Sequence, residues 1–408
     1  MTRDADVLIV GGGLNGPLLA LALARAGLRV TVLDARPEAE RADPAFDGRA
    51  YALALASVRL LRAMGLWPAL EATAQPILAV HAADGRPGEA PSPLSLTFDH
   101  AEIEEGPLGA MVEDRHLRRA LLQAMAAEPG VTHRAGVQVV AQSVLPSGVE
   151  VTLAGGERLT GRLLVGCDGR DSGTARRAGI RRLGWGYGQT ALVCAIAHER
   201  PHEGVARQVF LPAGPVAVLP LTGNRCSIVW TETAAAAAAI SRLDDTGYLA
   251  ALAARLGDLV GRFSLAGDRY AYPLGLSLAQ GFVADRLALV GDAAHGIHPI
   301  AGQGLNLGFR DVAALAEVLT LAARRGEDIA AAPVLERYQR WRRADAVMLA
   351  LATDGFNRLF SNDNALLRGV RDLGLAAAGA VPVLRRSFIR EAAGLTGDLP
   401  RLLQGRAI

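Results

Sequence analysis

Val7-Leu8-Ile9-Val10 leads directly into Gly11-Gly12-Gly13-Leu14-Asn15-Gly16, and this stretch decides the fold. The apolar run predicts a buried strand, and a helical pattern follows at residues 17–26. A second apolar run comes at residues 29–34. The order of strand, glycine-rich turn, helix and strand is typical of the start of a parallel sheet covered by helices.

The glycines also predict a ligand. Gly11, Gly13 and Gly16 match the G-x-G-x-x-G pattern, in which the missing side chains let the backbone approach a pyrophosphate. The helix that follows offers free N–H groups and the positive end of its dipole. Asp34 comes 18 residues after Gly16, where a carboxylate can accept both hydroxyls of an adenine ribose. The pattern predicts a dinucleotide and does not separate NAD from FAD.

Composition excludes several classes of protein. All 43 basic residues of this 408-residue chain are Arg, so catalysis through a Lys Schiff base and a P-loop of the usual form are both excluded. A net charge of +2 and an aromatic content of 5 % argue against a nucleic-acid partner. The widely spaced Cys167, Cys194 and Cys226 fit neither a disulfide framework nor a CxxC site, and with no recognisable signal peptide they predict a cytoplasmic protein.

Further along the chain the pattern of elements changes twice. From about Tyr187, short strands separated by Gly and Pro predict a mostly antiparallel sheet. A buried strand returns at residues 286–290, a long helix follows at 304–324, and Arg-rich helices are expected beyond Pro333. We therefore predict an α/β (α+β) protein with an inserted sheet domain. The predicted parts are a dinucleotide-binding domain of residues 1–73, 103–180 and 276–332, a substrate-binding sheet of residues 74–102 and 181–275, and a helical region of residues 333–408.

Two further motifs resemble those of a known family. Residues 164–172 read LVGCDGRDS, and residues 289–295 read LVGDAAH and continue at 298–308 as HPIAGQGLNLG. Their order and spacing resemble the DG and GD motifs of the FAD-dependent aromatic hydroxylases related to para-hydroxybenzoate hydroxylase. Residues 358–368 and 385–394 resemble the C-terminal part of the branch that acts in ubiquinone biosynthesis.

The resemblance implies a Rossmann-type FAD-binding domain and a monooxygenase reaction. FAD would be bound tightly but not covalently, and NAD(P)H would dock transiently to reduce it. O2 would then form a flavin C4a-hydroperoxide that hydroxylates an aromatic ring, here a prenylated phenol of ubiquinone biosynthesis. Such a reaction needs few catalytic side chains, so none is named. The resemblance places the backbone of Pro299, Gly302, Gln303 and Gly304 against the flavin.

The residues themselves support parts of this reading. Asp292 ends a buried strand, where it can hold a ribityl hydroxyl or simply cap the next segment. Arg49 and Arg115 can offer a bidentate fork to phosphate or lie at the surface. Asp168 and Gly169 can contact the cofactor or form a plain turn. The predicted cofactor-binding residues are Gly11, Gly13, Leu14, Asn15, Gly16, Asp34, Ala35, Arg36, Arg49, Arg115, Val139, Asp168, Gly169, Gly291, Asp292, Pro299, Gly302, Gly304, Leu305 and Asn306.

The substrate pocket is expected under the antiparallel sheet, with Phe210, Leu219, Pro220 and Trp230 as candidate lining residues. The C-terminal helices are expected to contact an anionic membrane surface on its cytoplasmic side, to contact partner proteins, or to be ordinary solvated helices. No metal is expected. Residues 198–202 match H-E-x-x-H, but Pro201 breaks the helix that this motif requires.

Two other kinds of function stay open from the sequence, and a third is disfavoured. A flavin oxidase or polyprenyl reductase on the same fold would yield only peroxide or a saturated bond. A non-catalytic FAD-binding subunit of a biosynthetic complex would not be reduced by NAD(P)H. An NAD dehydrogenase would lack flavin absorbance, and the DG and GD motifs argue against it.

Overall fold

The computed structural model describes residues 3–87, 92, 95–361 and 380–408. Its first sheet has the strand order β19-β20-β12-β1-β2-β8, and the neighbours pair in parallel except β19 with β20. The apolar runs that form β1 and β2 are buried along their whole length, as expected for a sheet covered on both faces. The strands are β1 (Val7–Val10), β2 (Val30–Asp34), β8 (Val131–Ala135), β12 (Leu163–Gly166), β19 (Val283–Ala284) and β20 (Leu287–Leu289).

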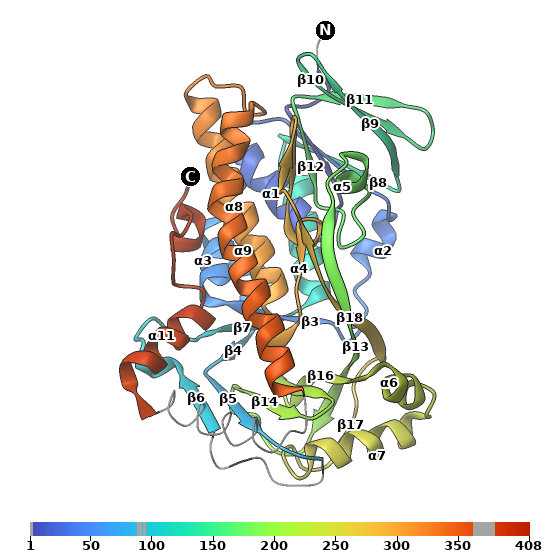
Figure 1. The fold of residues 1–408 in the computed structure, drawn as a ribbon, viewed down its shortest axis with the longest axis vertical. Helices are drawn as coiled ribbons and strands as arrows, with labels where there is room; N and C mark the ends of the chain where they lie inside the picture. Colours follow the sequence, from blue (N-terminus) through green and yellow to red (C-terminus); the bar gives the residue numbers. More distant parts are fainter. Residues whose placement is uncertain (1–2, 88–91, 93–94, 362–379) are drawn as a thin grey trace.

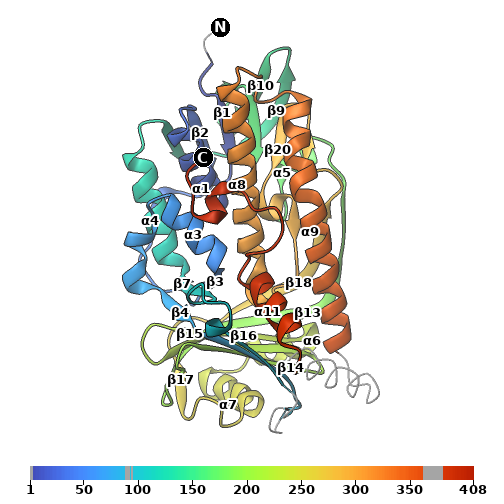
Figure 2. The same cartoon turned by 90° about the vertical axis from the view of Figure 1, so that its left-hand side faces the viewer.

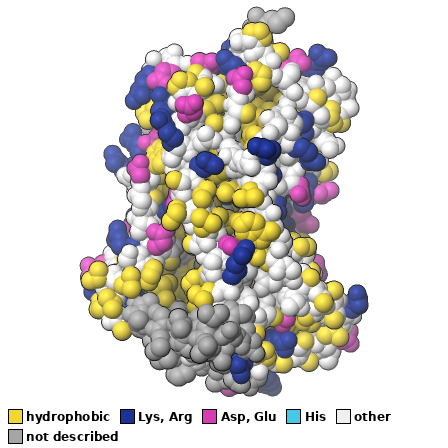
Figure 3. All heavy atoms as spheres, viewed as in Figure 1, with side chains coloured by type: hydrophobic (Ala, Val, Ile, Leu, Met, Phe, Trp, Pro, Cys, Tyr) yellow, Lys and Arg dark blue, Asp and Glu magenta, His cyan; other side chains and the backbone are white. Residues whose placement is uncertain are grey.

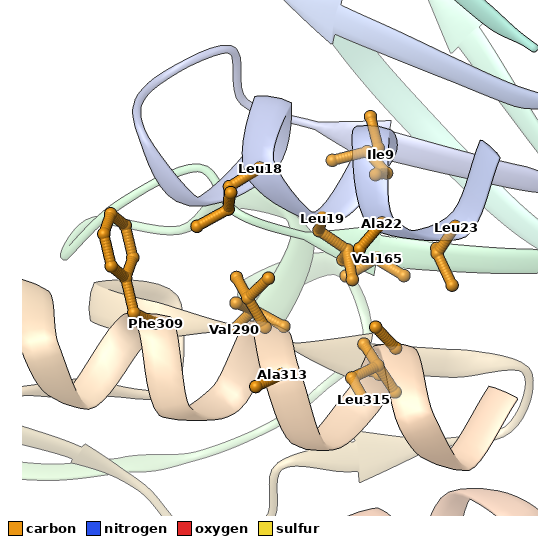
Figure 4. Close-up of a cluster of buried hydrophobic side chains, with 14 of the residues drawn as sticks. Ile9, Leu18, Leu19, Ala22, Leu23, Val165, Val290, Phe309, Ala313 and Leu315 are labelled. Atoms are coloured by element: carbon orange, nitrogen blue, oxygen red, sulfur yellow. The ribbon is translucent and has the colours of Figure 1, made fainter. Parts of the chain in front are cut away.

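Helices cover one face of this sheet (Figures 1 and 2). Figure 4 shows Leu18, Leu19 and Leu23 of α1 meeting Phe309, Ala313 and Leu315 of α8. Each of these leucines is completely buried, which contributes roughly 1.5–3 kcal/mol per side chain. The other face is covered by a small antiparallel sheet, β9-β10-β11. These elements are α1 (Asn15–Arg25), α4 (Asp114–Ala127), α8 (Gln303–Arg324), α9 (Ala332–Phe360), β9 (Val139–Leu145), β10 (Gly148–Leu153) and β11 (Arg158–Gly161).

A second, larger sheet has the order β21-β18-β13-β16-β15-β14-β5-β6, with β17 beside β13. Its pairs are antiparallel except β14 with β5. The helices α6 and α7 cover the outer face, away from the parallel sheet (Figure 1). The elements are β5 (Ala79–Asp84), β6 (Ser95–Asp99), β13 (Arg182–His198), β14 (Val205–Leu211), β15 (Gly214–Leu221), β16 (Arg225–Thr233), β17 (Phe263–Leu265), β18 (Tyr270–Ala279), β21 (His295–Gly296), α6 (Ala234–Ser241) and α7 (Asp245–Leu256).

The inner face of the large sheet meets a third, small sheet with the order β3-β7-β4. Ile77 and Met111 of that small sheet pack against Ala195 and Leu221 of the large one. The buried carboxylate of Glu113 also accepts from Arg225 at 2.8 Å, which ties the two sheets together. The remaining elements are α2 (Glu38–Ala42), β3 (Ala50–Ala54), α3 (Leu55–Ala63), η1 (Trp67–Ala69), η2 (Glu71–Thr73), β4 (Gln75–Ile77), η3 (His100–Glu102), β7 (Gly109–Glu113), α5 (Gly173–Arg177), η4 (Gly291–Ala293), η5 (Ile300–Gly302), α11 (Pro382–Ala392) and η6 (Arg401–Gln404).

This architecture confirms the predicted fold class, a parallel sheet with an inserted, mostly antiparallel sheet. The predicted C-terminal helices are present as α9, α11 and η6, whereas residues 362–379 lie outside the described part of the chain. Within the described residues, no helix combines the length and apolar character needed to cross a membrane.

Candidate active site

The glycine-rich turn lies at the carboxyl ends of the parallel strands, where open sheets of this kind bind ligands. Gly11 has a φ of +113°, and a Cβ there would lie 2.3 Å from the Cys167 carbonyl oxygen. A Cβ on Gly16 would lie 2.0 Å from the carbonyl oxygen of Gly11. A Cβ on Gly13 would meet no atom within 4 Å. The first two glycines are therefore needed by the turn itself, whereas Gly13 borders open space at the start of α1 and fits a bound pyrophosphate.

Asp34 ends β2 beside this turn and is buried. Its carboxylate accepts from the Arg36 N–H at 3.1 Å and from Arg41 at 2.7 and 3.1 Å. Residues 136–137 run alongside, because the N–H of Gly136 donates to Arg36 and that of Val137 to Asp34. This arrangement brings Ala35, Arg36 and the start of β9 at Val139 to one end of the predicted site.

A cavity of about 210 Å³ opens next to Asp34 and is lined by four arginines, Arg36, Arg41, Arg49 and Arg118, among its walls. Arg49 pairs with Asp47 at 2.5 Å and with the buried Asp114 at 3.1 Å. Burial would raise the pKa of Asp47, but Arg49 and Arg118 outweigh that effect and hold it below its usual range.

Of the two predicted phosphate-binding arginines, only Arg49 lines this cavity. Arg115 instead pairs with Glu113 at 2.7 Å and lies over the Phe46 ring. One turn further along α4, Arg118 lines the cavity and donates to the Arg41 carbonyl oxygen at 2.7 Å. Arg41 and Arg118 were not among the residues predicted from the sequence. Arg115 and Arg118 are three residues apart on α4 and therefore lie on the same face of the helix. This spacing would have suggested Arg118 as a second candidate.

The DG loop after β12 uses its carboxylate within the chain. Asp168 accepts from the Ser172 hydroxyl at 2.5 Å and from the Thr174 N–H at 2.9 Å. These bonds hold the loop against the start of α5, so the carboxylate of Asp168 serves the turn and the helix start within the chain. Gly169, with a φ of +82°, has open space around it.

The GD loop after β20 carries the carboxylate of Asp292, which, unlike that of Asp168, is not used, within the described residues, to hold its own loop. Arg182 donates to the backbone oxygens of Asp292 (3.1 Å) and Ala293, so the loop is held through its main chain. The Asp292 carboxylate takes no hydrogen bond from the part of the chain that the structure describes, and it remains available for hydroxyl groups of a ligand. The side chain of Asn15 packs against both Gly291 and Gly308 and so joins α1, the GD loop and α8.

The long helix α8 begins at this site. Gly302, with a φ of +64°, precedes its first turn, and a Cβ on Gly304 would meet nothing within 4 Å. The free N–H groups of such a turn suit an anion or the negative edge of a reduced flavin. Of the other predicted residues, Pro299 precedes η5, whose last residue Gly302 donates to its carbonyl oxygen at 2.9 Å, and Leu305 packs against the main core.

Asn306 was predicted to contact the cofactor, but its side chain is fully used by the protein. Its Oδ1 accepts from the Ala54 N–H at 2.9 Å and the Ser57 hydroxyl at 2.8 Å. Its Nδ2 donates to the carbonyl oxygens of Ala52 at 2.9 Å and Gly302 at 3.3 Å. Asn306 therefore clamps β3 to the start of α8, and its side chain has no hydrogen-bonding capacity left for a ligand.

A buried ion cluster supports the GD loop from behind. The Asp311 carboxylate accepts from the Gly291 N–H at 3.0 Å, from His295 Nε2 at 2.5 Å and from Arg342 at 2.8 Å. Burial alone would raise the pKa of Asp311, but His295 and Arg342 lower it below its usual range. Asp311 follows the GD motif closely in the sequence and can be associated with it. Its partner Arg342 lies on α9, and no sequence pattern near Arg342 indicates that the two side chains pair.

The four substrate-pocket candidates divide between the two faces of the large sheet. Phe210 and Leu219 lie on the inner face, toward the parallel sheet. Trp230 lies on the outer face, packs against Tyr248 of α7 and donates to Glu232 at 3.0 Å. Strand alternation places Pro220 on that outer face together with Val218. Trp230 and Pro220 were expected to line the substrate pocket on the inner face. Both side chains lie on the outer face instead, so they do not face the parallel sheet.

The apparent metal motifs are explained by their surroundings. His198 lies on a strand rather than a helix, and its Nε2 lies 3.0 Å from the Cys226 sulfur. His295 is bound to Asp311. No group of three potential metal ligands occurs among the described residues.

Comparison with known proteins agrees with this site. Residues 4–351 match the model of the FAD-binding domain family. The chain is 46 % identical to the ubiquinone hydroxylase UbiL of Rhodospirillum rubrum, across 99 % of this chain and 93 % of that protein. It is 38 % identical to the 3-demethoxyubiquinol 3-hydroxylase of Escherichia coli, across 96 % and 99 %. Among solved structures, the p-nitrophenol 4-monooxygenase PnpA of Pseudomonas putida shares the fold, with a TM-score of 0.80 at 21 % identity and coverage of 97 % and 99 %.

The chain therefore belongs to the FAD-binding monooxygenase family, in the group that contains the ubiquinone hydroxylases. It is an FAD-dependent aromatic hydroxylase that uses NAD(P)H. This result confirms the predicted cofactor and enzyme class, and it argues against an NAD dehydrogenase.

Proposed function

We propose that this enzyme hydroxylates the ring of a prenylated phenol during ubiquinone biosynthesis. The observation that carries the proposal is the 46 % identity to a ubiquinone hydroxylase across 99 % of the chain. The inner face of the large sheet also suits such a substrate, because many of its side chains are apolar. They include Leu219, Phe210 and Phe98. An isoprenoid tail needs an apolar path of this kind.

We further propose which residues hold FAD. Its pyrophosphate would lie over Gly13 and the N-terminus of α1, with Arg49 nearby as a cation. Its adenosine ribose would contact Asp34, and Asp292 would accept from the ribityl chain. Open space at Gly13 and Gly304 supports this placement, as does the Asp292 carboxylate, which has no partner among the residues that the structure describes.

The bound flavin supplies the centre that NAD(P)H reduces and at which O2 is activated. The residues of the chain perform the supporting work. The first turn of α8 directs N–H groups toward negative charge, and Asn306 fixes that turn against β3. The large sheet and α9 exclude water from the space above the site.

Complementation tests this function. A bacterial strain that lacks its ubiquinone ring hydroxylases is transformed with this gene, and its quinone intermediates are identified by mass spectrometry. We expect one accumulated intermediate to disappear and its product, heavier by one oxygen atom, to appear. Unchanged intermediates with soluble, yellow protein in the cells would contradict the proposal.

We also propose that α9 and α11 rest on the cytoplasmic face of an anionic membrane. Figure 3 shows hydrophobic side chains gathered over α9. On that helix Met348 is 67 % and Leu351 57 % exposed, and Val383 of α11 is 79 % exposed. The exposed Arg386 lies three residues from Val383 on α11, and a basic side chain beside exposed apolar ones favours interfacial binding.

Flotation with vesicles tests this contact. The protein should float with vesicles that contain anionic phospholipid and much less with neutral ones. Leu351→Glu combined with Val383→Glu should abolish flotation. If the double variant floats as the unmodified protein does, the surface is not a membrane contact, and a protein partner becomes the better explanation.

A further inference from the structure

We infer that His298 recognises an oxygen atom on the substrate ring and that three phenylalanines further along the same wall receive the prenyl tail. This inference rests on the proposed function. It assigns the orientation in which a prenylated ring enters the space between the two sheets.

His298 is completely buried, directly before Pro299 and the short helix that leads into α8. Its Nδ1 accepts a hydrogen bond from the Ile300 N–H at 3.3 Å. Its Nε2 is also buried and has no partner within the described part of the chain. A buried polar atom without a partner is rare in folded proteins and needs an explanation.

The protonation state of the ring decides what Nε2 can bind. Burial lowers the pKa of His298 to about 4, although Asp354 acts in the opposite direction. The ring is therefore neutral near pH 7. Because Nδ1 accepts a hydrogen bond, the single proton of the neutral ring sits on Nε2. His298 thus offers one N–H donor, whose complement is an acceptor such as a phenolate, hydroxyl or quinone oxygen.

Neighbouring side chains leave this donor unused. Tyr187 of β13 presents its ring edge to His298, with ring centroids 5.1 Å apart. Burial and Asp354 raise the pKa of Tyr187, so its hydroxyl keeps its proton. Asp354 accepts from Trp185 at 3.1 Å and pairs with Arg358 at 2.9 Å. The charge of Asp354 is therefore neutralised by Arg358, and it does not turn His298 into a cation.

The wall formed by β13, β14 and α9 becomes apolar with distance from His298. Asp354 of α9 accepts a hydrogen bond from Trp185 of β13. One turn further along α9, Asn357 donates to Gln189 of β13 at 3.0 Å. The helix then ends at Phe360. Trp185, Gln189 and Asn357 are paired in the middle of this wall. The buried Tyr187 hydroxyl, like His298 Nε2, has no hydrogen-bond partner among the described residues. His298 and the adjacent Tyr187 therefore form the polar end of the wall, where an oxygen atom of a ligand can bind.

At the apolar end, Phe210 of β14 meets Phe360 and Phe356 of α9. The ring centroids lie 4.3 Å apart for Phe210 and Phe360, 5.5 Å for Phe210 and Phe356, and 4.4 Å for Phe356 and Phe360. Phe356 remains 38 % exposed, so this cluster also borders solvent. A polar donor at one end and an aromatic cluster at the other match a molecule with an oxygenated head and an isoprenoid tail.

Two synthetic ligands test the assignment, 2-farnesylphenol and farnesylbenzene, which differ only in the ring hydroxyl. Their dissociation constants are measured on the FAD-loaded enzyme from changes in flavin absorbance, without NAD(P)H. We expect the unmodified enzyme to bind the phenol about tenfold more tightly, the value of one neutral hydrogen bond. His298→Leu should remove this preference, and His298→Gln, which keeps a donor, should restore part of it. Phe360→Ala should weaken both ligands and leave their ratio unchanged.

The outcomes separate the possible roles of His298. A preference that survives in His298→Leu overturns the assignment, as does a change in FAD content or flavin spectrum of that variant before any ligand is added, because the donor would then serve the cofactor. If the unmodified enzyme prefers the phenol and His298→Leu does not, yet no prenylated phenol is hydroxylated, the inference stands and the proposed function fails. If the unmodified enzyme binds neither ligand, both are overturned.

Discussion

Replacing Asp311 with Asn tests whether the buried ion cluster holds the GD loop in place. The carboxylate of Asp311 is fully buried and accepts from Gly291, His295 and Arg342 at 2.5–3.0 Å. An Asn keeps one oxygen acceptor but leaves the Arg342 cation, only 4 % exposed, without its buried counterion. Loss of one partner from a buried pair costs about 3–5 kcal/mol. We expect the free energy of unfolding to fall by about this amount, and we expect FAD to bind less tightly because Gly291 adjoins Asp292.

Asp345→Asn is the matched control. Asp345 pairs with Arg342 at 2.5 Å and with Arg310 at 2.9 Å, but its side chain is 36 % exposed, so water can replace it in both pairs. Exposed pairs contribute no more than about 1 kcal/mol. Urea titration followed by tryptophan fluorescence gives the free energy of unfolding, and the flavin-to-protein ratio after gel filtration gives FAD retention. Equal losses in the two variants would refute the reasoning, because burial would then not decide the strength of the cluster.

Three further predictions follow from the site. Asp292→Ala should weaken FAD binding at least about tenfold, the value of one hydrogen bond to a charged group, in a fluorescence titration; unchanged affinity and turnover would remove Asp292 from the site. Gly13→Ala should leave the melting temperature of the apoprotein unchanged while lowering FAD affinity, whereas Gly16→Ala should lower that melting temperature itself, because its Cβ would lie 2.0 Å from a carbonyl oxygen. Burial lowers the pKa of His298 from its ordinary value of about 6.5 to about 4 in the folded protein, so its contribution to stability is complete above pH 6.5 and is lost as the pH falls toward 4. Between pH 7 and pH 4 the free energy of unfolding should therefore fall by roughly 3 kcal/mol less in His298→Gln than in the unmodified protein. If the free energy of unfolding depends on pH in the same way in both proteins, the lowered pKa of His298 is contradicted.

Local sequence signals were enough for the parallel sheet and its turn. Residues 7–16 predict a buried strand and a tight glycine turn, and the structure shows why Gly11 and Gly16 tolerate no side chain. The motif at residues 289–308 likewise leads to the strand, loop and helix that are observed. Such features depend on backbone geometry within a few residues, so the chain itself encodes them.

Features that depend on distant contacts were predicted less well. Asn306 was expected to face the cofactor, but its amide bonds Ala54, which lies 252 residues earlier in the chain. Trp230 was expected in the pocket, but strand alternation only separates two faces, and the position of α7 decides which face is outside. Arg118 lines the cavity because α4 packs against α2, where Arg118 donates to the carbonyl oxygen of Arg41. The contacts of Asn306 and Trp230 leave no local pattern, whereas the three-residue spacing of Arg115 and Arg118 on α4 does indicate Arg118.

The most direct test of the central claim is the fate of molecular oxygen. Purified enzyme with FAD is supplied with NADH or NADPH, a prenylated phenol and ¹⁸O2, and the product is analysed by mass spectrometry. We expect a ring that carries one new hydroxyl with ¹⁸O, formed as the reduced nicotinamide is consumed. Consumption of the nicotinamide with only hydrogen peroxide formed and no labelled ring would contradict it and would identify the protein as an oxidase.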